Sequence, residues 1–158
     1  MGSLKRLGVI VAGVAVPVMA AMSPALAQAS ASTVHATGTG TEVGANPCTG
    51  AAGSFTFNAD EVMHTTADGS GGYHFSMTAT SDDRFVPDDP AEPTYSGRDT
   101  LHADAQEVGG GSTTTYVQVG GIRAPDGSSV RFRSLYHVTV SSDGTPTATH
   151  SVDTFRCA

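Results

Sequence analysis

Residues 128–157 read SSVRFRSLYHVTVSSDGTPTATHSVDTFRC. Apolar and polar side chains alternate on both sides of Asp143-Gly144, and β-branched residues recur in both runs. This alternation is typical of strands, and Asp-Gly between two such runs is a common sequence for a tight hairpin turn. The stretch therefore predicts two long antiparallel strands joined by a short turn.

Two turns fit this hairpin, a two-residue turn or a three-residue loop with a glycine bulge, and they differ by one residue in register. The two-residue turn pairs Phe132 with Phe155 and Val130 with Cys157. Because it sets apolar side chains opposite one another, we expect this register. At Asp126-Gly127 we expect a three-residue loop. This loop length places apolar residues of the preceding strand on the same face as those of the hairpin.

The whole chain beyond residue 50 repeats this pattern, and none of it shows a helical stripe. Strands are expected near 53–67, 72–81, 94–107, 113–123, 128–141 and 146–157, with a short one around Phe85. The predicted fold is all-β, an antiparallel meander of about six to eight strands. Long strands joined by tight turns favour closure into a small barrel, with a β-sandwich as the alternative.

The N-terminal region has the composition of an export signal. Lys5 and Arg6 precede an apolar run over 7–22, and Ala25-Leu26-Ala27 supplies small residues for cleavage. We therefore expect a signal peptide over 1–27, a flexible segment rich in Ala, Ser, Thr and Gly over 28–46, and a β-barrel domain over 47–158. The mature protein is expected to be secreted, with no membrane association after cleavage.

Charge narrows the range of partners. The mature chain keeps 8 − 2 = 6 arginines and no lysine against 15 acidic residues, a net charge of −9. Nucleic-acid binding needs a basic surface, so we expect no nucleic-acid partner.

Cys48 and Cys157 are the two cysteines of the chain. An even number of cysteines in an exported protein predicts a disulfide. Closing a loop of roughly 110 residues stabilises the folded state by about 4 to 5 kcal/mol in the chain-entropy description. The disulfide also removes the available cysteine nucleophile.

The expected register assigns side chains to two faces. Phe132, Tyr136 and Phe155 share the buried face, whereas arginines and histidines occupy the other. On that outer face an apolar row runs across three strands and suggests a contact surface for a protein partner, the alternative being ordinary β-propensity on a solvated sheet. The row consists of Val117, Leu135 and Val152.

Histidines form two candidate sites. His137 faces His150 in the chosen register, and His64 and His74 share the polar face of an earlier hairpin. Such pairs suit a divalent metal or a pH-sensitive patch. A metal site also needs further ligands, and HExxH and Cys/His spacings are absent, so we expect solvated histidines and no metal or other cofactor.

The acidic, proline-containing stretch 82–92 is interpreted as a long loop. It lacks the residue order of an EF-hand, so a solvated loop or a lid over an internal pocket is favoured over a calcium site.

Several short motifs resemble a group of small exported proteins from high-GC Gram-positive bacteria. The resemblance covers roughly residues 46–158 and implies a β-barrel similar in outline to lipocalin-like or allene-oxide-cyclase-like barrels, with its two cysteines near the domain ends. It implies no activity, ligand or catalytic residue. The motifs are Asn46-Pro47-Cys48-Thr49-Gly50, Glu61-Val62-Met63-His64, Gly71-Gly72-Tyr73-His74, Tyr136-His137-Val138-Thr139-Val140 and Phe155-Arg156-Cys157.

The sequence contains no GxSxG, Walker or GxGxxG motif, so no catalytic residue is assigned. We expect a non-catalytic binding module for a small apolar ligand or a protein partner. The alternatives are an isomerase- or cyclase-type barrel enzyme that uses strand histidines, and a structural protein associated with the cell envelope.

Overall fold

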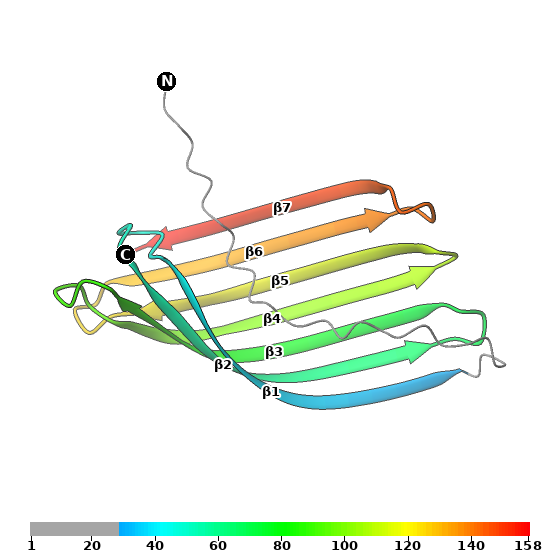
Figure 1. The fold of residues 1–158 in the computed structure, drawn as a ribbon, viewed down its shortest axis with the longest axis horizontal. Coiled ribbons are helices and arrows are strands. Elements are labelled where there is room, and N and C mark those ends of the chain that lie inside the picture. Colours follow the sequence, from blue (N-terminus) through cyan, green and yellow to red (C-terminus); the bar gives the residue numbers. More distant parts are fainter. Residues whose placement is uncertain (1–28) are drawn as a thin grey trace, which may run out of the picture.

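The computed structural model describes residues 29–158, so the predicted signal peptide lies outside the described part. The chain forms one antiparallel sheet in the order β1 to β7, and Figure 1 shows the strands side by side in sequence order. The all-β class and the antiparallel meander are confirmed. The strands are β1 (Ser30–Ala45), β2 (Ala52–Ala67), β3 (Tyr73–Pro87), β4 (Tyr95–Val108), β5 (Gly111–Arg123), β6 (Ser129–Val140) and β7 (Pro146–Cys157).

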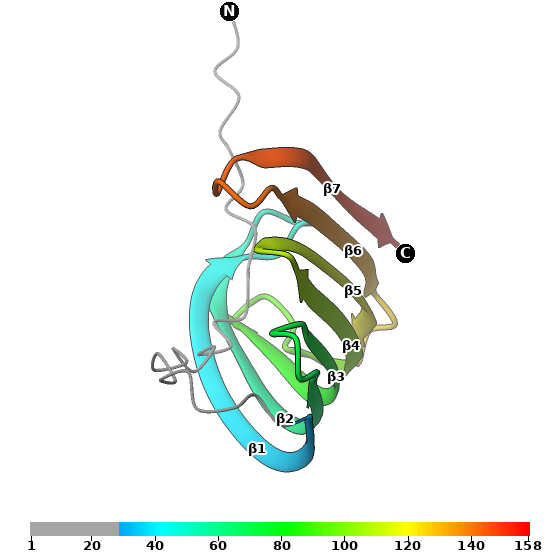
Figure 2. The same ribbon diagram turned by 90° about the vertical axis from the view of Figure 1, so that its right-hand side faces the viewer.

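The sheet curls strongly but remains open. Figure 2 shows β1 and β7 as the two lips of the curl, and these edge strands pair only with β2 and β6 respectively. The meander is therefore present, but the expected closure into a barrel does not occur, and the sheet is an open, strongly curled one. We call the inner surface the concave face and the outer surface the convex face.

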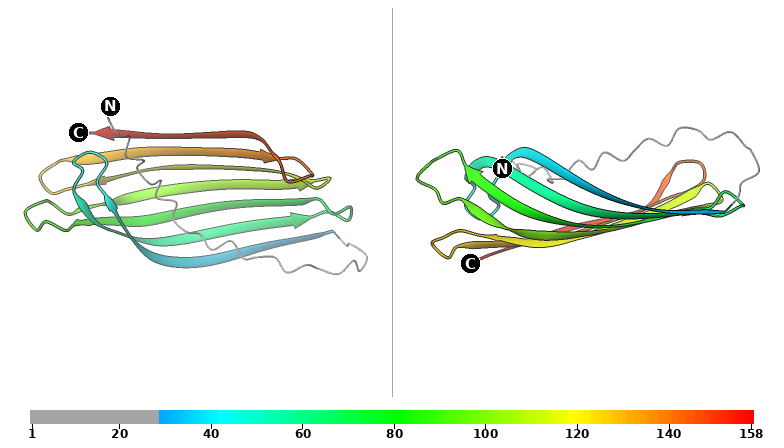
Figure 3. Two further views of the ribbon diagram at one scale, coloured as in Figure 1. Left: turned by 45° about the horizontal axis from the view of Figure 1, so that its top comes forward. Right: turned by 90° about the horizontal axis from the view of Figure 1, so that it is seen from below.

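A disulfide joins the β1–β2 turn to the end of β7. Cys48 and Cys157 have an S–S distance of 2.01 Å and a Cα–Cα distance of 5.7 Å, as the sequence predicted. The curl is tightest at this end, which we call the closed end, and the sheet is flatter at the opposite, open end (Figure 3). The disulfide is compatible with an extracellular location.

The expectation of a flexible segment over 28–46 is wrong, because Ser30–Ala45 forms β1 and pairs along its length with β2. Glycines make this pairing feasible. Gly40 lies opposite Phe57, and a Cβ atom on Gly40 would be 2.2 Å from the Phe57 ring. The Phe57 ring lies over the backbone at Gly40 and fills the space that a side chain there would occupy. A strand with few large residues can therefore still pack against its neighbour.

The predicted pairings are confirmed, although one turn differs. Phe132 pairs with Phe155, but the β6–β7 connection is a three-residue loop with Gly144 at φ 84° rather than a two-residue turn. A bulge between Thr139 and Val140 shifts the register by one residue. The bulge compensates for the longer loop and restores the apolar pairing that alternation favoured.

The expectation of a long acidic loop over 82–92 is also wrong for residues 82–87. Residues 82–87 continue β3, and the short strand expected around Phe85 is part of it. Alternation sends Asp82 to the convex face and Asp83 to the buried concave face.

The core lies at the closed end of the concave face. A buried cluster contains Phe85, Tyr95, Ile122, Ala124 and Val130, with Cys48 and Phe55 packed against it. Farther along the face, Phe132 and Tyr136 are half-buried as expected for inward-facing rings. Phe155 faces the same side but is 47% exposed, because β7 is an edge strand with no neighbour over it.

Within residues 29–158 there is no helix of the length and hydropathy needed to cross a membrane.

Candidate functional site

The two faces of the sheet differ in charge. The concave face carries six carboxylates and, across the described strands, no arginine or histidine. The convex face carries three carboxylates, six arginines and six histidines, a formal charge of 6 − 3 = +3 with neutral histidine. The concave carboxylates are Glu42, Glu61, Asp83, Asp99, Glu107 and Asp153.

Two of the concave carboxyl groups are buried. Asp83 is 4% exposed and Asp99 is 6% exposed, and they lie on the neighbouring strands β3 and β4. The Ser81 hydroxyl donates a hydrogen bond to Asp99 Oδ1, and the Gln118 amide donates to Asp99 Oδ2. Asp83 Oδ2 has no hydrogen-bond partner.

This burial changes the acidity of Asp83. Desolvation raises the pKa of its carboxyl group from 3.8 to about 7, and the negative charge of Asp99 adds to the effect. Removal from water disfavours the ionised form, and a second carboxylate nearby repels the charge. Asp83 therefore holds a proton over much of the weakly acidic range.

Beyond these two buried carboxyl groups, toward the open end, the concave face carries more apolar side chains, although Glu61, Glu107 and Asp153 also lie there. Met63 pairs with Met77 across β2 and β3, and the Tyr116 and Tyr136 rings stack with their centroids 5.2 Å apart. Burial, then Asp153 and Tyr136, raise the pKa of the Tyr116 hydroxyl, so this phenol stays neutral. The resulting surface has aromatic and sulfur-containing side chains next to buried polar groups, a combination found in many ligand sites.

A hollow of about 480 Å³ lies at the open end beside the β2–β3 turn. It is open to solvent, and Tyr73 is the one aromatic residue among those lining it. His74 and Glu107 also line it, together with small and polar residues. Because its lining includes the concave residue Tyr73 and the convex residue His74, the hollow lies at the rim of the sheet and is not an enclosed apolar cavity.

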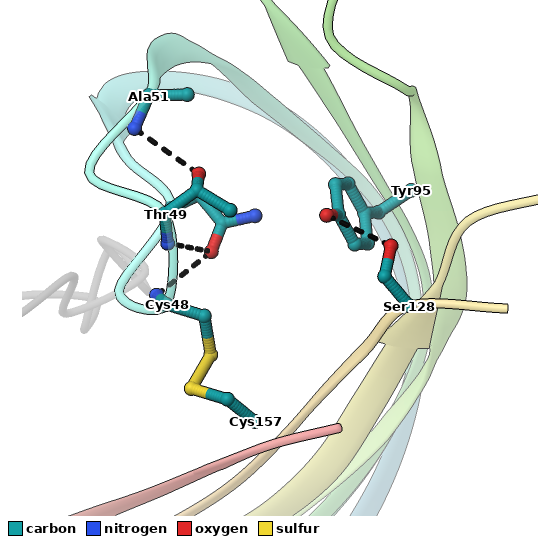
Figure 4. The surroundings of a disulfide bond; sticks show 7 residues. Cys48, Thr49, Ala51, Tyr95, Ser128 and Cys157 are labelled. Carbon is teal, nitrogen blue, oxygen red and sulfur yellow. Dashed lines mark hydrogen bonds between the residues drawn. A yellow bond between two sulfur atoms is a disulfide. The ribbon is translucent and has the colours of Figure 1, made fainter. Parts of the chain in front are cut away.

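The closed end is held by local polar contacts as well as the disulfide. Asn46, which is 2% exposed, accepts hydrogen bonds through Oδ1 from the backbone amides of Cys48 and Thr49 at 2.8 and 3.3 Å. Across this end the Ser128 hydroxyl donates to the Tyr95 hydroxyl at 3.1 Å, and Figure 4 shows both side chains together with the disulfide. The Asn46 contacts fix the turn from which β2 starts, and the Ser128–Tyr95 contact links β4 to the β5–β6 loop.

The predicted histidine pairs lie on the convex face. His137 is directly opposite His150, as expected, whereas His64 and His74 are diagonal neighbours. His137 Nδ1 is 2.7 Å from Thr115 Oγ1, which gives this ring a local hydrogen-bond partner. No group of three or more His, Cys, Asp or Glu residues suited to a metal was found in the part of the chain that the structure describes.

The predicted apolar row is contiguous on the convex face. Val117 pairs with Leu135, and Leu135 pairs with Val152. Val117 and Leu135 are half-buried, and Val152 is 43% exposed. The row is narrow and lies between arginines on one side and His137 and His150 on the other.

Sequence reasoning missed the burial of Asp83 because it treated residue 82 onward as a loop, and it did not consider the inward orientation of Asp99 within the predicted strand over 94–107. The signal was present, since alternation from Met77 carries through Ala79 and Ser81 to Asp83 and Phe85. The same alternation, followed along each strand, places every arginine and histidine of the described strands on the convex face.

Comparison with protein-family models, curated proteins and solved structures gave no match to this chain.

Proposed function

We propose that the protein is a secreted, non-catalytic binding module that takes a small, largely apolar ligand on its concave face. The observation that carries this proposal is the apolar part of that face beyond the buried carboxyl groups. Residues 29–158 leave it partly uncovered: Tyr116 and Tyr136 are half-buried, and Val34 and Phe155 at the two lips are 50% and 47% exposed. Burial of such rings by a ligand is favourable by roughly 25 cal/mol per Å² of apolar surface.

The charge of the concave face restricts the ligand. Asp83 and Asp99 border the apolar surface, and Glu61 and Asp153 lie on the same face. Because no arginine or histidine of the described strands offsets these groups, an anionic ligand is disfavoured. A neutral ligand, or one with an amine or another hydrogen-bond donor, suits this face.

The arrangement gives no support to a barrel enzyme that uses strand histidines. Such an enzyme needs an imidazole and a carboxylate converging on a cleft. Here all six histidines of the described strands point to the convex face, whereas the buried carboxyl groups point to the concave face. The sheet separates the two kinds of group.

A fluorescence titration with the neutral probe N-phenyl-1-naphthylamine tests the proposal. We expect saturable binding with a blue-shifted emission, weakened at least five-fold by Tyr136→Ala. Leu135→Ala is the matched control, because Leu135 is adjacent on the same strand but faces the opposite side. Circular dichroism and a thiol assay verify that each variant is folded and has its disulfide.

Two outcomes contradict the proposal: absence of saturable binding by the unmodified protein, and equal weakening by the two substitutions. The secreted state has its own test. The mature protein should be recovered from the culture medium of a cell that expresses the full chain, with an N-terminus at residue 28.

A further inference from the structure

The convex face of β5, β6 and β7 carries a concentrated set of arginines. Arg131 and Arg156 are directly opposite each other on adjacent strands, and Arg133 lies two residues along from Arg131. Arg123 is diagonal to Arg131, because it pairs with Ser129. We call these four residues the arginine patch. Opposed positions on a sheet have Cβ atoms about 5 Å apart, and diagonal ones are about 7 Å apart.

No carboxylate of residues 29–158 lies within 4 Å of a guanidinium group of the patch, although the terminal residue Ala158 pairs with Ser129 beside it. All four arginines are exposed, and the convex faces of β5, β6 and β7 carry no acidic side chain. Among residues 29–158, Arg98 is the one arginine with a carboxylate within 4 Å, and its partner is Asp82 at 2.8 Å. Like charges directly opposite on a sheet repel, so Arg131 and Arg156 destabilise the sheet unless an anion lies between them. An unpaired cluster in a protein whose overall charge is negative points to an external anion.

The shape of the surface favours an extended ligand. The patch lies on an outward-curved sheet, where side chains diverge, so it does not enclose a small anion (Figure 2). From Arg131 to His137 the strand spans six residues, about 20 Å, and the apolar row lies between them. A chain molecule with repeated negative groups could follow this length and contact several guanidinium groups.

The neighbouring side chains narrow the chemical class. Guanidinium groups bind carboxylate, sulfate and phosphate through paired hydrogen bonds. Next to the arginines lie Thr154, Ser129 and the aliphatic row, and the convex faces of β5 to β7 contain no Phe, Tyr or Trp. Binding of single-stranded nucleic acid relies on stacking of bases on large aromatic side chains, and this surface offers only the imidazoles of His137 and His150, beyond the apolar row.

We infer that the arginine patch binds an acidic polysaccharide, with the carboxylate or sulfate groups of successive sugars placed between Arg131, Arg156 and their neighbours. This inference concerns the convex face and is independent of the ligand proposed for the concave face. It assigns the protein two sites of opposite charge preference, one on each side of the sheet.

Fluorescence anisotropy with labelled oligogalacturonate and labelled heparin oligosaccharide tests the inference and separates carboxylate from sulfate. The test variant is Arg131→Thr with Arg156→Thr. The matched control is Arg84→Thr with Arg98→Thr, which removes two positive charges from the convex faces of β3 and β4. We expect the test variant to lose at least ten-fold in affinity for one of the two probes, and the control less than three-fold.

The salt dependence gives a second measurement. The slope of log Kd against log salt should become shallower in the test variant, because fewer anionic groups are neutralised on binding. Equal losses in the two variants would overturn the inference, since overall charge would then explain binding. Absence of binding to both glycans, or tighter binding to labelled oligo(dT) than to either, would overturn it as well.

Discussion

The substitution Asp83→Asn replaces a buried carboxyl group with an amide of nearly the same size. The pKa of Asp83 is raised from 3.8 to about 7 in the folded state, first by desolvation and then by the charge of Asp99. The folded state therefore binds more protons than the unfolded state between about pH 4 and pH 7. The contribution of Asp83 to the free energy of unfolding is therefore greatest below about pH 4 and is lost as the pH rises through 7.

The magnitude follows from the size of the shift. A displacement of about three pKa units at 1.36 kcal/mol each corresponds to roughly 4 kcal/mol, an upper limit that applies above pH 7. Asn has no charge to lose or gain, so the variant does not experience this penalty. We expect Asp83→Asn to be more stable than the unmodified protein by up to about 4 kcal/mol at pH 8, and by less than about 1 kcal/mol at pH 4.

Urea unfolding followed by circular dichroism at pH 4 and pH 8, with the disulfide intact, measures this difference. Asp82→Asn is the control, because the Asp82 carboxylate is exposed and paired with Arg98 on the opposite face. Its effect should stay within about 1 kcal/mol at both pH values. A gain for Asp83→Asn that is the same at pH 4 and pH 8 would refute the reasoning, because a pH-independent gain does not come from ionisation.

Three further substitutions or treatments test other parts of the fold. Reduction of the disulfide, which links residues 109 apart, should lower the free energy of unfolding by about 4 to 5 kcal/mol in urea titrations, and an unchanged midpoint would contradict its role. Gly40→Ala should cost more than about 1 kcal/mol and speed amide exchange in β1, because its Cβ meets the Phe57 ring, whereas Gly38→Ala has its nearest contact at 3.9 Å and should cost less. His137→Ala and His150→Ala should each cost under about 1 kcal/mol, and a loss above 2 kcal/mol or tight zinc binding would show that the pair has a structural or metal-binding role.

Alternation and turn chemistry predicted most of the sheet. The pairings of Phe132 with Phe155 and of Tyr116 with Tyr136 were predictable because an apolar side chain on the wrong face loses its burial. The type of the turn at Asp143-Gly144 was not, because a bulge elsewhere in the hairpin restores the same register. In this hairpin the type of turn therefore does not determine which residues of the two strands pair.

Strand β1 was not predictable by the same means, and the burial of Asp83 follows from alternation only when β3 is continued past residue 81. The β1 sequence lacks the apolar alternation that identifies strands, and Gly40 leaves the space that the ring of Phe57 on the next strand occupies. Aspartate is usually exposed, so its residue type argues against a buried position for Asp83. The alternation of side chains along β3 nevertheless points it to the concave face, where it is buried. Both cases depend on neighbours that are distant along the chain from the residue in question.

The single covalent link at the closed end also sets how the width of the sheet varies along its length. Near Cys48 and Cys157 the separation between β1 and β7 is fixed by bond lengths, whereas at the open end only the twist of the intervening strands sets it. Small changes in twist accumulate over seven strands. The distance between β1 and β7 at the open end can therefore change without loss of the hydrogen bonds between neighbouring strands. For the ligand proposed on the concave face, this flexibility would let the sheet adjust its width at the open end while the disulfide holds the other end in place.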